Sequence, residues 1–400
     1  PTDKAGGQIT FEPSLPVEGL PSGLEYAPDD RALTFENLSV SEEGTLRIKV
    51  LVDGNECAEA GPLIIQAGDQ ASFWGDLHGQ TGETVGVNTI ESYFDFARNK
   101  TFLDVSAHQG NDFQINAAFW DHLNIVTAEW DEPGRFTVFP GYEWSGNTSI
   151  GGDHNVYFAK EGYTIRRCSH ALMEDRSEMS SDANTLTDLY DALRDEDAVI
   201  YAHVGGRYAN IHYDHDPLLE TAVEMHSAWG TFEWILTDGF PLGRRVGVVC
   251  NSDGHKGRPG ASYPGASTFG SLGGLTCFLT DQNDRASIME AQRRRHHYGT
   301  TGCRMFMNVS AKLPTAGMIC TRNPAAVPDT PRLNADHIMM GDIVETSATT
   351  ADISLSVEAH AGIEKIELHN GSEVLETFRT YNDAALGKRY RVIWSGAEYR

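Results

Sequence analysis

The sequence has few basic residues, and this shortage narrows the classes of partner that the protein can have. Lysine and arginine together number 31 in 400 residues, against 57 aspartates and glutamates, and the formal net charge is -26. Binding to a polyanion needs clustered cations that displace counterions from phosphates. The one dense basic run, residues 293–297, lies at the end of an expected helix, where cations favour the helix dipole. We therefore expect no nucleic-acid partner.

Long apolar runs and paired cysteine motifs are also missing. No stretch reaches the roughly 18 to 20 apolar residues that a membrane-spanning helix requires, so we expect no membrane partner. The six cysteines form no C-x-x-C pair, which excludes zinc ribbons and thioredoxin-like sites. Cys250 and Cys277 lie in apolar, strand-like runs, and buried free thiols favour a reducing, cytoplasmic compartment. A signal peptide removed before Pro1 would leave no trace.

The sequence patterns divide the chain into a central α/β segment between two β-rich flanks. Residues 1–70 and 345–400 contain alternating runs separated by turn residues, which predict small immunoglobulin-like modules, the second of them incomplete. Residues 71–312 alternate strand and helix patterns, as expected for a seven-stranded βα barrel. The Gly- and Pro-rich residues 313–344 are the expected linker.

The expected elements can be placed individually. The central strands are expected at 73–77, 102–106, 136–142, 198–203, 221–226, 246–252 and 274–280. The helices between them are expected at 90–98, 115–126, 186–193 and 286–295. In the C-terminal flank, the turn at residues 369–371 predicts a hairpin, and residues 389–394 form a last strand-like run.

Six of the expected strands end in side chains that can bind metal ions. In chain order these are His78 with Gln80, His108, Glu143 with His154, His203, Glu224 or His226, and Asp253 with His255. The carboxyl ends of barrel strands converge on one face, where active sites are built. Buried imidazoles and carboxylates are costly unless they are paired or bind a metal. Nitrogen and oxygen ligands without thiolates suit zinc, manganese or iron at a catalytic site.

Several candidate residues keep two interpretations at this point. Of Glu224 and His226 we expect only one to face the site, and His226 is either a core residue or a substrate contact. Gln80 either binds a metal weakly or orients a neighbouring ligand. Four further side chains lie in polar loops after the expected ligands, where they contact either substrate or solvent: Arg207, Tyr208, Lys256 and Arg258.

The ordered motifs resemble those of the polymerase and histidinol phosphatase (PHP) superfamily of distorted seven-stranded βα barrels. The matching segments are D-L-H-G-Q, P-G-Y-E-W, Y-A-H-V-G-G and N-S-D-G-H, and the resemblance covers roughly residues 73–310. More narrowly, G-D-L-H-G-Q-T-G-E-T, H-Q-G-N-D-F and H-H-Y-G-T-T-G-C-R resemble the PHP-like branch that includes carbaryl and other carbamate insecticide hydrolases.

This resemblance implies a set of metal ligands. They are His78, Gln80, His108, Glu143, His154, His203, Asp253 and His255, with Glu143 as the expected bridge between two ions. Two positions depart from the superfamily pattern, because Gln80 replaces a histidine and Gly86 stands near the place of a further ligand. We therefore expect two tightly bound divalent ions at most.

The expected activity is hydrolysis by a metal-bound hydroxide. Asp253, His255 and Glu143 are the expected catalytic residues, and the branch implies a small carboxylic or carbamic ester as substrate. Two alternatives remain open. One is a phosphoesterase acting on a small phosphate ester, and the other is a non-catalytic binding module stabilised by metal.

Overall fold

A computed structural model describes residues 7–27, 33–68, 70–263 and 271–382, so the predicted strand at 389–394 lies outside the described residues. The chain forms two compact units. One comprises Pro1–Asp69, Arg304–Asn308 and Ser356–Ile363, and the other comprises Gln70–Cys303, Val309–Leu355 and Glu364–Arg400. Within the described ranges, no helix combines the length and apolar character needed to cross a membrane.

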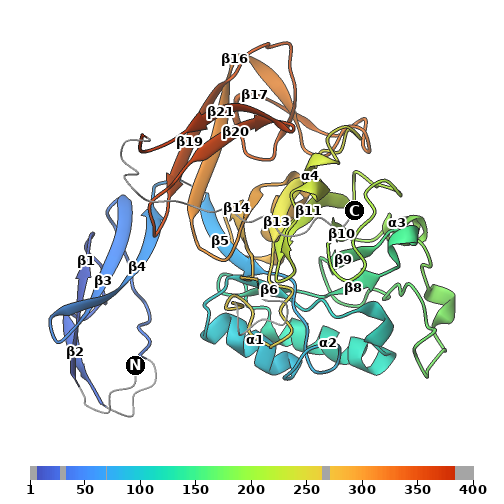
Figure 1. Ribbon diagram of the computed structural model, residues 1–400, viewed down its shortest axis with the longest axis horizontal. Coiled ribbons are helices and arrows are strands. Elements are labelled where there is room, and N and C mark those ends of the chain that lie inside the picture. Colours follow the sequence, from blue (N-terminus) through green and yellow to red (C-terminus); the bar gives the residue numbers. More distant parts are fainter. Residues whose placement is uncertain (1–6, 28–32, 69, 264–270, 383–400) are drawn as a thin grey trace. The chain divides into compact units, whose positions relative to one another are not determined.

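The N-terminal residues form one antiparallel four-stranded sheet, drawn in blue in Figure 1. Its strand order is β2-β1-β3-β4, with β1 at Gly7–Pro13, β2 at Gly23–Tyr26, β3 at Gly44–Val52 and β4 at Asn55–Ile65. Asp53 and Gly54 form the two-residue turn between β3 and β4, with φ of 49° and 79°. An Asp-Gly pair tolerates this left-handed backbone, which matches the twist of a hairpin.

The larger unit contains a first central sheet of order β15-β14-β5-β6-β7. These strands span Ala71–Asp76 (β5), Val105–Ala107 (β6), Thr137–Phe139 (β7), Leu275–Thr280 (β14) and His297–Thr300 (β15). The β5, β6 and β7 strands are parallel, whereas β14 runs antiparallel to β5. The carboxyl ends of the three parallel strands therefore lie at one edge.

The second central sheet has the order β12-β11-β10-β9-β8, and β13 pairs with β11. Its strands span Gly141–Ser145 (β8), Asp153–Phe158 (β9), Ala198–Ala202 (β10), Glu220–Ser227 (β11), Gly230–Thr231 (β12) and Gly247–Cys250 (β13). The β10, β11 and β13 strands are parallel, whereas β9 is antiparallel to both β8 and β10. The sequence did not predict β9 because its residues follow the third motif without a helical connection.

The two central sheets approach a barrel without closing one. Only Pro140 separates β7 from β8, so the chain passes directly from one sheet to the other. On the opposite side, β13 and β14 form no ladder and are joined by single bonds: Gly274 N donates to Asn251 O at 2.9 Å, and the Thr276 hydroxyl binds the Cys250 backbone at 3.1 and 2.8 Å. Leu77 N donates to Asn251 Oδ1 at 2.9 Å. The predicted α/β class is thus confirmed, whereas the seven strands that we predicted as one distorted βα barrel are divided between separate sheets among the described residues.

Four helices occur where the sequence predicts them, and each begins at a side-chain cap. They are α1 (Ile90–Asn99), α2 (Ala117–Trp130), α3 (Leu186–Leu193) and α5 (Arg285–Arg294). The caps are Thr89, Asn116, Thr185 and Asp284, and each accepts a hydrogen bond from the backbone N–H three residues later. Such caps satisfy backbone donors that a helix leaves unpaired. The shorter helical segments are α4 (Trp234–Thr237), η1 (Asp112–Gln114), η2 (Thr148–Ile150) and η3 (Met179–Ser181).

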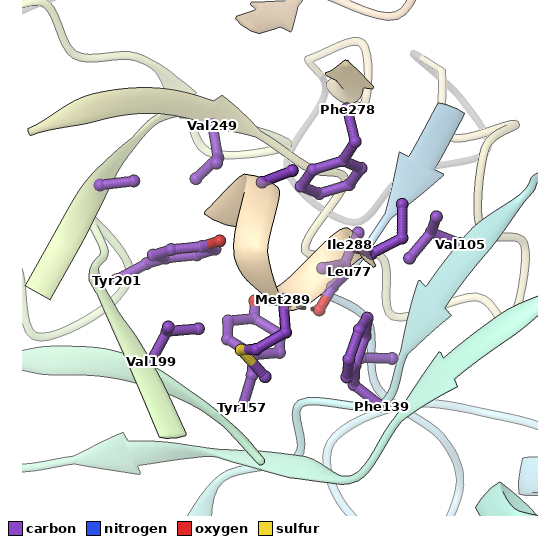
Figure 2. Packing of buried hydrophobic residues seen from close by; sticks show 13 residues of the cluster. Leu77, Val105, Phe139, Tyr157, Val199, Tyr201, Val249, Phe278, Ile288 and Met289 are labelled. Atoms are coloured by element: carbon purple, nitrogen blue, oxygen red, sulfur yellow. Dashed lines mark hydrogen bonds between the residues drawn. The ribbon is translucent and has the colours of Figure 1, made fainter. Parts of the chain in front are cut away.

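Helix α5 packs into the core between strands of both central sheets. Figure 2 shows Ile288 and Met289 among Val105 and Phe139 of the first sheet and Tyr201 of the second. All five side chains are at most 1% exposed. Burying each large apolar side chain stabilises the fold by about 1.5–3 kcal/mol. This shared core holds the two sheets together although their backbone ladder is open.

The C-terminal part is also built from strands. The sheet has the order β17-β16-β18, with β19 beside β16, and a separate hairpin pairs β20 with β21. The bounds are Phe306–Cys320 (β16), Arg332–Met339 (β17), Ile343–Glu345 (β18), Asp352–Glu358 (β19), Ile366–Asn370 (β20) and Glu373–Phe378 (β21). Residues 313–344, which we predict as a linker, instead lie largely in β16, β17 and β18. A register shift between Lys312 and Gly317 interrupts the alternation there.

A buried histidine makes the stability of this fold depend on pH. His297 is 3% exposed and donates through Nδ1 to Val248 O at 3.0 Å. Burial lowers its pKa from 6.5 to about 4. The unfolded chain therefore takes up a proton below pH 6.5 that the folded chain accepts only near pH 4, so stability is lost as the pH falls through this window.

We predict that His297→Asn makes unfolding less sensitive to acid. Between pH 7 and pH 5, wild type should lose about 2 kcal/mol more unfolding free energy than the variant, since one pKa unit corresponds to about 1.4 kcal/mol. Urea unfolding at the two pH values measures this difference. Equal losses in the two proteins would show that His297 is not responsible.

Candidate metal centre

A buried carboxylate, Glu224 of β11, orients two histidines. Its Oε1 atom lies 3.0 Å from Nδ1 of His78 and 3.1 Å from Nδ1 of His203. The amides of Asn155 and Asn251 donate to its Oε2 atom, each at 3.0 Å. All five side chains are at most 1% exposed. Because both Nδ1 atoms face Glu224, both Nε2 atoms face the other way.

The two Nε2 atoms converge on Asp253, which follows β13. Nε2 of His78 lies 3.3 Å from Oδ1, and Nε2 of His203 lies 3.4 Å from Oδ2. The two rings meet edge to face, with centroids 4.5 Å apart. One ligand atom from each of the three residues lies within 4.8 Å of the others, so this part of the described chain could hold a metal ion.

The unpaired atoms of this group fit a metal ion. Nε2 of His78, Nε2 of His203 and Oδ1 of Asp253 are buried without a hydrogen-bond partner in the described structure. Leaving buried polar atoms unpaired costs about 1–3 kcal/mol each. Two imidazole nitrogens and a carboxylate oxygen are a donor set that can hold a divalent metal ion.

The carboxylates of the group also favour a bound cation. Burial acts to lower the pKa of His203, but Glu224 and Asp253 outweigh it and raise the pKa to about 10. Burial likewise opposes a charged His78, yet Asp253 and Glu224 raise its pKa well above the usual value. The carboxylates therefore hold protons on both imidazoles when no metal is bound. A divalent ion would replace those protons.

Asp253 has an unusual backbone conformation, and a glycine lies beside His203. Asp253 has φ of 45°, a left-handed conformation that aspartate tolerates better than most residues. The Trp229 indole donates to Asp253 Oδ2 at 2.7 Å, and Ser252 N donates to Asp76 Oδ1 at 2.8 Å. A Cβ atom on Gly205 would lie 2.8 Å from Nε2 of His203. Because position 205 is a glycine, no side chain fills the space beside Nε2 of His203.

A second polar cluster surrounds Glu143 next to this group. Oε2 of Glu143 lies 3.8 Å from Nε2 of His78 and accepts hydrogen bonds from the amides of Asn111 at 2.5 Å and Gln80 at 3.3 Å. Oε1 of Gln80 accepts from Val85 N at 3.3 Å, so its NH₂ group faces the carboxylate. In this arrangement Gln80 orients Glu143, which is the second of the two roles that we considered.

Gly86, the other departure from the superfamily pattern, lies in the same loop. A Cβ atom there would lie 2.4 Å from the Gln80 carbonyl oxygen. The loop therefore excludes any side chain at position 86, including a further metal ligand.

The remaining predicted ligands lie outside the group of three. His108 Nδ1 accepts from Gly110 N at 3.3 Å, and its Nε2 lies 3.1 Å from the Thr81 hydroxyl. His154 Nδ1 donates to Gly152 O at 2.9 Å, and its Nε2 lies 4.0 Å from Oε2 of Glu220. His255 is 9% exposed, and its Nδ1 donates to the Asp253 carbonyl at 2.8 Å. Their roles as ligands stay predictions.

The predicted substrate contacts fall into three environments. Arg207 binds Asp153 Oδ1 through Nε at 2.8 Å and stacks on a neighbouring ring. His226 follows Glu224 by two residues on β11, across a register shift in the pairing with β13, and its ring nitrogens contact the Thr231 hydroxyl and Leu272 O. Three others are exposed: Tyr208, Lys256 and Arg258.

Three polar residues of the site were missed from the sequence. Asn155 and Asn251 bind Glu224, and Trp229 binds Asp253. The sequence left open that Glu224 faces the site, and its contacts with His78 and His203 bear this out. Asn155 could have been found only by recognising β9 as a strand.

A family model for proteins of unknown function, DUF3604, matches residues 55–210 and 247–370. The chain belongs to the DUF3604 family. An uncharacterized protein of Chlamydia pneumoniae is 22% identical to this DUF3604 protein over 411 aligned positions, covering 94% of the chain and 61% of the relative. An uncharacterized protein of Chlamydia trachomatis is 21% identical, covering 76% and 53%. The chain thus spans little more than half of the length of these relatives.

Solved structures resemble the DUF3604 chain only distantly. A two-domain protein of Bacteroides vulgatus, described as containing a predicted PHP-like metal-dependent phosphoesterase, has a TM-score of 0.41 and 9% identity, covering 74% of this chain and 89% of its own. The lesion-specific endonuclease EndoQ of Pyrococcus furiosus has a TM-score of 0.33 and 13% identity, covering 52% of each chain.

We predict that Glu224→Gln weakens metal binding by about 10 to 100-fold, as is typical when a residue that orients a metal ligand is replaced. The neutral amide would no longer hold the two imidazoles by charge. Zinc titration in competition with a chelator measures the affinity. His226→Gln on the same strand is the matched control and should bind zinc like wild type. Equal zinc affinities in all three proteins would show that Glu224 does not support metal binding.

Proposed function

We propose that this protein is a metal-dependent hydrolase that acts on a small phosphate ester. The observation that carries the proposal is the buried group of His78, His203 and Asp253, whose ligand atoms converge without hydrogen-bond partners in the described structure. A divalent ion held there would lower the pKa of a bound water towards 7 and polarise the oxygen of the scissile group.

The chain's own residues would prepare this chemistry. Glu224 contacts Nδ1 of both histidines, and this contact leaves Nε2 of each ring to bind the ion. Trp229 fixes the Asp253 carboxylate. We assign the movement of the proton from the attacking water to Asp253 and His255, which adjoin each other through the Asp253 carbonyl.

A phosphate ester suits the site better than the carboxylic or carbamic ester implied by the sequence resemblance. Glu143, whose Oε2 lies 3.8 Å from Nε2 of His78, would hold a second cation beside the first. Two ions held there would supply charge stabilisation for a displacement at phosphorus. The Arg207 guanidinium supplies a further positive charge for an anionic group.

We predict that Asp253→Asn abolishes turnover and loosens the metal. The substitution removes the carboxylate charge while keeping the side-chain shape, so turnover should fall by at least about 1,000-fold with a smaller change in KM. Steady-state kinetics and metal analysis of the folded variant measure both effects. Asp238→Asn, in a separate segment after α4, is a control with expected wild-type behaviour. Normal turnover in folded Asp253→Asn would contradict the mechanism.

We predict that 4-nitrophenyl phosphate is hydrolysed with at least tenfold higher kcat/KM than 4-nitrophenyl acetate. The two substrates share a leaving group, so the ratio reports only the group attacked. A chelator should remove the activity while far-ultraviolet circular dichroism stays unchanged, since the core in Figure 2 contains no metal ligand. Preference for the acetate would favour a carboxylic ester as the substrate class. Unfolding by the chelator would indicate a structural metal.

A further inference from the structure

A cavity of about 660 Å³ lies between the start of α2 and residues 172–175. Its walls are largely apolar, from Phe113, Ala117, Ala118, Leu172 and Met173, and its polar lining is Gln114, Asn116, Glu174 and Asp175. This volume is within the range of about 300–1,000 Å³ that is typical of small-molecule sites. None of the eight predicted metal ligands lines the cavity.

The cavity is connected to the metal centre by a short series of contacts. The Arg207 guanidinium lies 5.2 Å from the centroid of the Phe113 ring, which forms a wall of the cavity. Arg207 Nε and backbone N bind the two carboxylate oxygens of Asp153 at 2.8 and 3.0 Å. Asp153 Oδ2 and His203 Nε2 both lie within 3.0 Å of the position that a Cβ on Gly205 would take. These contacts link a wall of the cavity to His203 through Arg207 and Asp153.

The neighbouring backbone gives a second connection. Asn111, two residues before Phe113, donates to Glu143 Oε2 at 2.5 Å. The segment from Asn111 to Phe113 thus contacts the second polar cluster at one end and lines the cavity at the other.

Arg207 is placed to bind an anion at the junction. Its side chain is 30% exposed, and Asp153 holds only its Nε atom. No described residue accepts a hydrogen bond from its two terminal nitrogens. A guanidinium with two available nitrogens can bind a phosphate oxygen pair in a fork.

The segment that precedes Leu172 and Met173 is held by hydrogen bonds. The backbone N–H of Cys168 donates to the Asp112 carboxylate, and His170 Nδ1 lies 2.6 Å from Asp182 Oδ1. Arg167 is fully buried and donates to Ile115 O at 2.9 Å. Leu172 is 79% exposed, so most of its side chain is open to solvent.

We propose that this cavity binds the leaving group of the substrate, that the leaving group is flat and apolar, such as an aryl group, and that Arg207 binds the phosphate between the cavity and His203. The proposal rests on the proposed phosphoesterase function. Glu174 and Asp175 at the cavity disfavour a leaving group with its own negative charge. The expected substrates are thus aryl monoesters without an acidic substituent.

The test compares two inhibitors that share an anionic head, phenylphosphonate and methylphosphonate, on the manganese-loaded protein. Calorimetry should show that Leu172→Ser/Met173→Ser binds phenylphosphonate about tenfold more weakly than wild type, because apolar contact area is lost. Methylphosphonate affinity should change less than twofold. Ile125→Ser, which removes an exposed apolar side chain elsewhere on α2, is the matched control. Arg207→Lys should weaken both phosphonates, since lysine lacks the fork.

Kinetics separate this proposal from the function on which it rests. In the double variant, kcat/KM should fall about tenfold for 4-nitrophenyl phosphate and less than twofold for methyl phosphate, with metal content unchanged. Equal loss for both phosphonates, or no loss for phenylphosphonate, would overturn the cavity assignment. If wild type shows selective phenylphosphonate binding that depends on Leu172 and Met173 but hydrolyses neither ester, the cavity assignment stands and the phosphoesterase function fails.

Discussion

The carboxylate of Glu224 is the constraint on which the rest of this site depends. A fully buried carboxylate costs several kcal/mol to desolvate unless cations and donors surround it. Here it contacts one nitrogen of His78, one of His203, and the amides of Asn155 and Asn251. These contacts fix the tautomer and the direction of both rings, so their second nitrogens must face Asp253. Carboxylate-bound histidines of this kind are typical of metal sites.

The same contacts join the two central sheets where the backbone ladder is open. His78 follows β5 in the first sheet, whereas Glu224 lies on β11 in the second. Asn251, after β13, donates to Glu224 and accepts from Leu77 N, so one amide links all three segments. The hydrophobic core around α5 holds the sheets together from within. The candidate centre thus lies where the two central sheets meet, and a bound cation would stabilise the contact between them.

Sequence patterns identified the elements that carry the site, because strand ends and helix caps are local features. They placed His78, His203 and Asp253 at strand ends, and these three side chains do converge. Two kinds of feature could not be predicted. The side-chain hydrogen bonds of Thr276 and Asn251 link the two sheets where no strand ladder forms, and hydrophobic periodicity gives no information on such bonds. The orientation of Gln80 towards Glu143 depends on Val85 N, a contact set by the loop conformation.

X-ray absorption spectroscopy of the zinc-loaded protein tests most directly whether this buried group binds a metal. We expect two imidazole nitrogens at about 2.0–2.1 Å from the ion, from His78 and His203. His203→Ala, studied at saturating zinc, should retain the ion with one imidazole fewer, whereas His226→Ala should give the wild-type spectrum. An unchanged number of imidazoles in His203→Ala, or a wild-type spectrum without imidazole, would contradict the assignment of this buried group as a metal centre.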